Sequence, residues 1–167
     1  MTTDLCGAFW ESIPHPPKII YRQPEEADIL AQYDSETDTI IVHITKADGY
    51  ALYYSTIFHD LTHREVYHWI KGKGLSVEDM LMGKREPFDE ILAEIGAVIL
   101  CHGNGLYPET KVAHLAYLDY QKIRLQDKRL LLEVFPIVSS AMRRILKRTV
   151  RRGFLPLEIR LALLKVR

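Results

Sequence analysis

The sequence predicts an α+β fold, with a small antiparallel sheet followed by a mostly helical domain. Two observations support this prediction. Short stretches rich in β-branched residues, which favour strands, precede Asp48. From Tyr50 onward the apolar residues recur at helical spacing. The length of 167 residues is that of one domain.

Three short strands are expected, at residues 18–22, 29–33 and 39–44. The polar stretch 34–38 would join the last two strands as a hairpin. Residues 1–17 contain three prolines close to their end, so we expect an irregular N-terminal arm laid over the domain.

Four helices are expected to follow, at residues 50–70, 88–104, 109–125 and 128–150. Pro136 would kink or split the last of them. The long loop 71–87 is expected to contain a helical turn over 76–82, and loops of this length are often functional. The domain would therefore span residues 18–150, and residues 151–167 would add a C-terminal tail with an amphipathic helix over 157–166.

The overall charge and the lack of targeting signals indicate a soluble cytoplasmic protein. The 22 basic and 22 acidic residues cancel, so net charge gives no reason to expect a nucleic acid or a membrane as partner. No signal peptide is visible, and no apolar run reaches the ~20 residues that span a bilayer. Cys6 and Cys101 do not form a disulfide framework, which is consistent with a reducing compartment.

His59 and His63 are the strongest candidates for a metal site. Residues four apart lie on one face of a helix, so both imidazoles can reach the same ion. This is the spacing of the H-E-x-x-H zinc hydrolases, in which the glutamate acts on a zinc-bound water. Asp60 occupies the position of that glutamate and is one methylene shorter.

Glu90 and Glu94 could complete the site from the next helix, where they have the same i, i+4 spacing. One of them would be the third ligand, and the other would accept the free ring N–H of a ligand histidine. We assign Glu90 as the ligand and Glu94 as the orienting acid, with the reverse assignment left open. One Zn²⁺ per chain is expected.

Several segments resemble the zincin-like metallopeptidase domain of ArdC-type antirestriction proteins, which also occurs in polyvalent proteins of plasmids and phages. Residues 53–63 (YYSTIFHDLTH) resemble its active-site helix, and residues 91–97 (ILAEIGA) resemble its second signature. The weaker similarities are those of residues 34–40, 114–118 and 127–129. The resemblance does not extend to the single-stranded-DNA-binding domain that precedes the peptidase domain in ArdC proteins.

The resemblance implies a zincin-like fold and a zinc metallopeptidase acting on a protein or peptide substrate. His59, His63 and a glutamate of the second helix would be the ligands, and Asp60 the general base. His114 and Tyr117, three apart on one helical face, would donate hydrogen bonds to the oxyanion unless they are ordinary core residues. The strand at 39–44 would pair with an extended substrate through its backbone edge.

The shorter Asp60 suggests a second hypothesis. It withdraws the carboxylate by roughly one bond length, and a misplacement of ~1 Å can cost about a hundredfold in rate. The chain would then be a zinc-binding but catalytically weak or inactive regulatory module of a mobile element. Its candidate partner is DNA, contacted through a basic face that is otherwise a solvated helix surface: Arg143, Arg144, Lys147, Arg148, Arg151 and Arg152. A third hypothesis is a metal-free interaction protein, and the oligomeric state is open.

Overall fold

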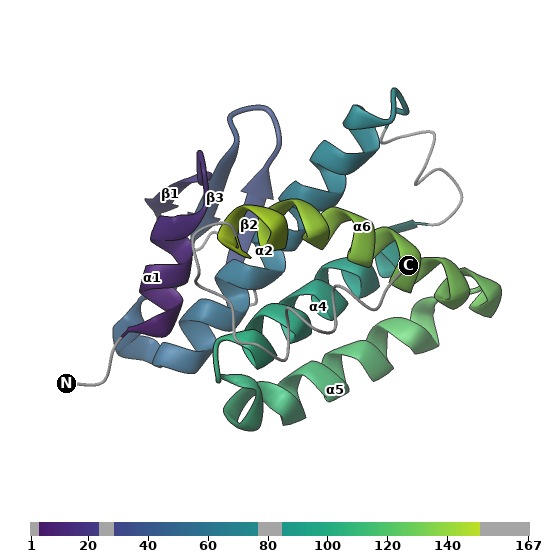
Figure 1. Cartoon of the computed structure of the whole chain (residues 1–167). Coiled ribbons are helices and arrows are strands. Elements are labelled where there is room, and N and C mark those ends of the chain that lie inside the picture. The colour runs from purple at the N-terminus through teal and green to yellow at the C-terminus, as the bar shows by residue number, and fades with distance from the viewer. Residues whose placement is uncertain (1–3, 24–28, 77–84, 151–167) are drawn as a thin grey trace.

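A computed structural model describes residues 4–23, 29–76 and 85–150 of the chain (Figure 1). It confirms the α+β class, because a small sheet is followed by a group of long helices. The strands β1 (Lys18–Tyr21), β2 (Ala31–Asp34) and β3 (Thr39–Val42) form a sheet in the order β1-β3-β2.

The sheet is mixed, so the prediction of an antiparallel sheet is wrong for β1. β2 and β3 form the expected antiparallel hairpin, with Asp34 opposite Thr39. β1 lies on the other side of β3 and runs parallel to it, with Lys18 opposite Thr39. The reason is burial: β3 is the most buried strand and takes the centre of the sheet, whereas β1 and β2 are only partly buried and take the edges.

Residues expected to be irregular contain a helix, α1 (Leu5–Ser12). The Asp4 side chain begins it by accepting a hydrogen bond from the backbone N–H of Gly7 at 2.7 Å. The helix buries Cys6 and Phe9, and the Phe9 ring packs edge-on against Phe58. The prolines that suggested an irregular arm all lie beyond the end of α1.

The four expected long helices are present, and their ends lie within a few residues of the predicted ones. They are α2 (Tyr50–Gly72), α4 (Arg85–Gly103), α5 (Tyr107–Arg124) and α6 (Leu131–Val150), with short 3₁₀ turns at Lys46–Asp48 and Lys128–Leu130. Pro136 lies in the second turn of α6 and does not split it, so that alternative is wrong. Residues 77–82 of the expected loop turn and the tail helix 157–166 lie outside the described residues.

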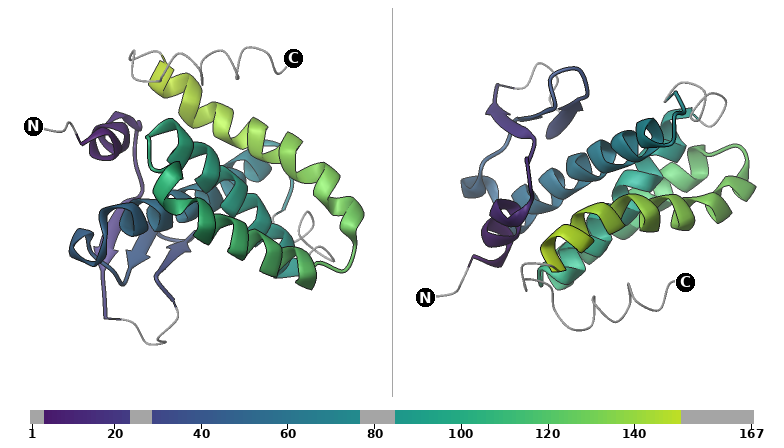
Figure 2. Two further views of the ribbon diagram at one scale, coloured as in Figure 1. Left: turned by 90° about the horizontal axis from the view of Figure 1, so that it is seen from below. Right: turned by 45° about the horizontal axis from the view of Figure 1, so that its top comes forward.

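α4 is the central helix and packs against α2, α5 and α6 (Figures 1 and 2). The sheet lies against the opposite side of α2, through β2 and β3. The core is therefore continuous from the inner face of the sheet through α2 to α4 and α6. Within the described residues, no helix is both long and apolar enough to cross a membrane.

A buried arginine fastens the sheet to α2. Arg64 on α2 donates two hydrogen bonds to the carboxylate of Asp38, which ends the β2–β3 turn, at 2.6 and 2.8 Å. It also donates to Glu65 on its own helix and to the backbone oxygen of His15. One guanidinium thus joins three separate segments of the chain.

α2 and α4 approach each other closely where Gly96 faces Thr62. A Cβ added at Gly96 would lie 2.8 Å from the Cβ of Thr62 and closer still to both of its γ atoms. Thr62 is fully buried and donates a hydrogen bond to the Phe58 oxygen, so it has little room to move. Only glycine at position 96 permits this helix spacing.

We expect Gly96→Ala to lower the free energy of unfolding by about 1–3 kcal/mol, because the added methyl overpacks the α2–α4 contact. Gly72→Ala is the matched control, since the nearest atom to an added Cβ there is 4.0 Å away. In a helix with room, alanine should be neutral or stabilising. Urea unfolding measures both, and equal effects of the two substitutions would contradict this account of the contact.

Candidate metal centre

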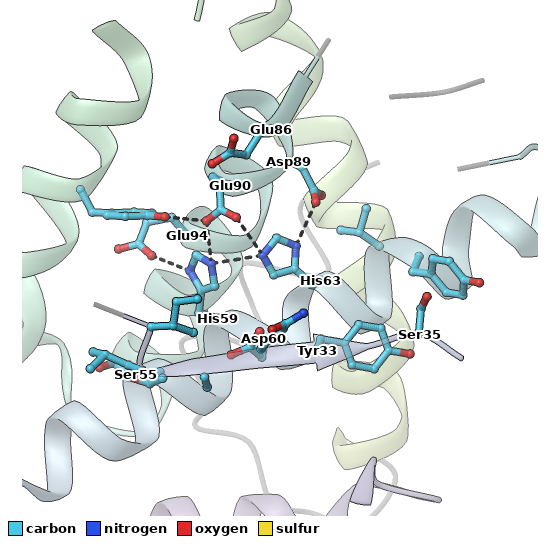
Figure 3. Close-up of a pocket in the computed structure, with 18 of the residues that line it drawn as sticks. Tyr33, Ser35, Ser55, His59, Asp60, His63, Glu86, Asp89, Glu90 and Glu94 are labelled. Carbon is cyan, nitrogen blue, oxygen red and sulfur yellow. Dashed lines mark hydrogen bonds and ion pairs between the residues drawn. The ribbon is translucent and has the colours of Figure 1, made fainter. Parts of the chain in front are cut away.

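Three side chains from α2 and α4 converge at one point. The Nε2 atoms of His59 and His63 lie 3.2 Å apart. One oxygen of Glu90 lies 3.1 Å from the Nε2 of His59, and the other lies 3.6 Å from the Nε2 of His63 (Figure 3). These residues form a group that could hold a metal ion.

The spacing of these donors fits a small divalent ion. Ligands about 2.0–2.1 Å from a tetrahedrally coordinated ion stand ~3.3 Å from one another. The distance between the two Nε2 atoms, and the distance from each Nε2 to one of the two Glu90 oxygens, bracket that value. Two imidazoles and a carboxylate also form a donor set typical of catalytic zinc sites, which leave a fourth position open.

Helical geometry explains why the donors meet. His59 and His63 are one turn apart on α2, and Glu90 and Glu94 are one turn apart on α4. The contact between Gly96 and Thr62 brings these two faces together just beyond the site. The prediction that two helices each present a pair of inward residues therefore matches the observed placement.

The charges of the cluster reinforce one another. Burial alone would lower the pKa of His59, but its hydrogen bonds with Glu90 and Glu94 raise it to about 10. Burial alone would raise the pKa of Glu90, but its hydrogen bond with His59 and the charge of His63 lower it to about 2. Without a metal, the cluster is thus held together by imidazolium–carboxylate pairs.

Each of the two histidines has a second carboxylate on its other ring nitrogen. The Nδ1 of His59 is 2.8 Å from Glu94, and the Nδ1 of His63 is 3.2 Å from Asp89. Such pairs fix the tautomer and the ring orientation of metal-binding histidines, because Nδ1 carries the proton and Nε2 is left for the ion.

Glu94 lies where it was expected as the orienting acid, and the geometry favours Glu90 as the ligand. One oxygen of Glu94 contacts His59, and the other contacts the Nδ1 of His114 on α5 at 2.6 Å. Both oxygens are therefore engaged on the far side of the His59 ring from His63.

Sequence reasoning missed Asp89. Asp89 directly precedes Glu90 and is therefore 100° away from it around the helix. A search for residues four apart on one helical face does not find such a neighbour. The available signal was the Asp-Glu pair in the first turns of α4, facing a helix that carries two histidines.

The proposed oxyanion donors His114 and Tyr117 also lie at this cluster. The Tyr117 hydroxyl donates to Glu90 at 2.6 Å, and its ring packs edge-on against His59. Burial and this hydrogen bond raise the pKa of Tyr117. His114 is buried, and its Nε2 has no hydrogen-bond partner among the residues that the structure describes.

Asp60 lies on the side of α2 that faces β2 (Figure 3). It is 5% exposed and accepts a hydrogen bond from the backbone N–H of Tyr33. Burial raises the pKa of Asp60, and the charges of His59 and His63 oppose that rise. The carboxylate thus lies between the edge of the sheet and the histidines, whose charges it senses.

The cluster opens into a cleft of about 970 Å³ between β2 on one side and α4 and α5 on the other. β3 was expected to offer a backbone edge here, and that expectation is wrong because β3 is paired on both sides. The free edge at the cleft is β2. The backbone N–H and C=O groups of Gln32 and Asp34 face β3, so those of the alternate residues Ala31 and Tyr33 point away from the sheet.

The basic residues of α6 do not form one continuous face in the described part of the chain. Arg143 is exposed, whereas Arg144 turns toward α2, where it donates to the His68 oxygen and lies 3.6 Å from Glu65. The side chains of Lys147 and Arg148, and all of Arg151 and Arg152, lie outside the described residues.

Comparison of the chain with protein-family models, curated proteins and solved structures found no match. The similarity to the ArdC-type domain therefore remains a prediction drawn from the residues themselves.

We expect Asp89→Asn to weaken metal binding about 10- to 100-fold, because His63 would lose the charge that orients its ring and raises its basicity. Glu86→Gln is the matched control. It lies about one turn earlier on α4 and pairs instead with Arg124 at the surface. Competition with a chromophoric zinc chelator measures both affinities, and an unchanged affinity in Asp89→Asn would contradict the role given to Asp89.

We also expect metal binding near neutral pH to release roughly one to two protons, because histidine must be deprotonated to act as a ligand. With a pKa of about 10, His59 is protonated in the metal-free protein at that pH. The affinity should therefore rise as the pH is raised toward that value. Titration calorimetry in buffers of different ionisation enthalpy counts the protons, and a buffer-independent enthalpy would contradict the prediction.

Proposed function

We propose that this chain is a metal-dependent hydrolase of the metallopeptidase type, with zinc held by His59, His63 and Glu90. The observation that supports it most strongly is the convergence of three donors, at distances that suit a tetrahedral ion, on the floor of an open cleft. Two imidazoles and one carboxylate suit zinc better than calcium or magnesium, which prefer oxygen ligands. When bound, zinc would lower the pKa of a water and polarise a carbonyl.

The residues around the cluster support distinct roles. Asp60 is the general base, which takes a proton from water and passes it to the leaving amine. The raised pKa of Asp60 is suited to this task, because a carboxylate with the low pKa of an ordinary aspartate is a weak proton acceptor. Asp89 and Glu94 hold the two imidazoles in the orientation that directs each Nε2 to the same point.

His114 is the better placed of the two oxyanion donors, because the Tyr117 hydroxyl is already engaged with Glu90. His114 lines the cleft, and its Nε2 has no partner among the described residues. The Nδ1 of the same ring is held by Glu94 at 2.6 Å, which fixes the orientation of the imidazole.

The free edge of β2 supports a polypeptide substrate. The outward backbone groups of Ala31 are placed to pair with an extended chain lying along the cleft. The N–H of Tyr33 is used by Asp60, so a substrate pairing with β2 would lie directly beside the proposed base.

One observation favours the second candidate, a metal-binding module without hydrolytic activity. The side chain of Asp60 is one methylene shorter than that of a glutamate, and it is hydrogen-bonded to the Tyr33 N–H on the side of the sheet. If that bond persists when substrate binds, the carboxylate serves to position β2, and the metal cluster has a structural or binding role.

Substitutions at position 60 separate the two candidates. With zinc bound, Asp60→Asn should lower kcat/KM on an unstructured protein such as casein by about 10²–10⁴-fold, because Asn cannot accept the proton. Asp60→Glu should raise it by up to about a hundredfold, because the carboxylate extends toward the water.

Zinc content and the urea midpoint of each variant serve as controls for these rates. His63→Ala, which removes a proposed ligand, should lose both metal and activity. If the wild type and Asp60→Glu bind zinc yet cleave nothing, the hydrolase proposal fails and the binding module is favoured.

A further inference from the structure

Apart from the histidines, the charged side chains on the described walls of the cleft are all acidic. Their acidic residues come from α2, from α4 and from the turn after β2: Glu36, Asp60, Glu86, Asp89, Glu90 and Glu94. No lysine or arginine is among the described residues that line the cleft. A concave site of uniform sign focuses its field and selects ligands of opposite charge.

A bound divalent ion does not neutralise this set. The four inner carboxylates, Asp60, Asp89, Glu90 and Glu94, carry two more charges than the ion supplies when both imidazoles are neutral. The cleft therefore remains anionic in the metal-loaded protein.

Two further acids lie toward solvent, one on each wall. Glu86, on α4, forms a surface pair with Arg124 at 3.3 Å, which offsets part of its charge. Glu36, in the turn after β2, is exposed and makes no ion pair with the described residues through its side chain. Glu36 is thus the acid of the rim that is best able to receive a cation from a ligand.

The cleft also contains two features that suit a bound chain. The Nε2 of His114 is buried in the wall without a described partner, and the backbone groups of Ala31 point outward along β2. The Ala31 groups are placed for a ligand that follows the cleft, and the unpartnered Nε2 belongs to a side chain that lines the cleft beside the metal cluster.

We propose that the cleft binds extended polypeptide segments that carry lysine or arginine, with Glu36 contacting a cationic side chain beside the edge of β2. This deepens the proposed function and rests on it, because the segment is the substrate of the metal site. The same field repels phosphate groups, so a nucleic acid is not the ligand of this cleft.

The test measures binding, so it does not depend on turnover. Zinc-loaded Asp60→Asn, in which hydrolysis is suppressed, is titrated against three fluorescent peptides of equal length, rich in lysine, serine or glutamate. We expect the affinity order lysine, serine, glutamate at low salt. The lysine preference should largely vanish near 1 M salt, where the Debye length is about 3 Å.

Adding Glu36→Gln to Asp60→Asn should weaken binding of the lysine peptide about two- to fivefold and leave the serine peptide unchanged. Glu11→Gln in the same background is the matched control, since this exposed acid lies on α1 and outside the cleft. Equal effects of the two substitutions would overturn the role of Glu36.

Other outcomes overturn the inference outright. These are equal binding of the three peptides at low salt, no binding of any of them, or displacement of the lysine peptide from the cleft by a single-stranded oligonucleotide at low salt. Failure of the metal-loaded wild type to cleave casein would instead count against the proposed function, and the charge preference in binding would still be measured.

Discussion

The candidate site depends on how closely α2 and α4 can pack. Gly96 presents only hydrogen atoms to Thr62, so the two helices meet at a distance that no other residue would allow. Just beyond this contact, His59 lies within hydrogen-bond distance of both Glu90 and Glu94. A wider helix spacing would separate imidazoles from carboxylates and leave each of them as an unpaired buried group, which is costly.

The cluster is held by electrostatic compensation. Histidines and acids that would be unfavourable in a protein interior on their own stabilise one another, as the opposite shifts in the pKa of His59 and Glu90 show. The same arrangement suits a metal ion. A divalent cation would take the place of the proton between the two Nε2 atoms and Glu90, while Asp89 and Glu94 keep their contacts with the Nδ1 atoms.

The parts of the structure set by local periodicity could be predicted from the sequence. Spacing of i, i+4 was enough to place His59 with His63 and Glu90 with Glu94 on inward faces, and the long helices were found within a few residues of their ends. Features set by tertiary contacts could not be predicted. The central place of β3 follows from its burial relative to β1, and the pairing of Asp89 with His63 depends on the angle between two helices. α1 was missed because the prediction rested on the prolines after it and did not consider Asp4, which caps it.

The link made by Arg64 bears on how the cleft can move. Its bidentate bond to Asp38 and its bond to the His15 oxygen anchor the hairpin and the segment before β1 to α2. Asp60 anchors β2 to the same helix a little further along. One side of the cleft is therefore a connected unit of the sheet and α2, which carries the sheet edge, the two histidines and the proposed base. The opposite wall is tied to the same metal cluster, because His114 and Tyr117 of α5 are hydrogen-bonded to Glu94 and Glu90, so a movement of α5 on ligand entry would have to break those bonds.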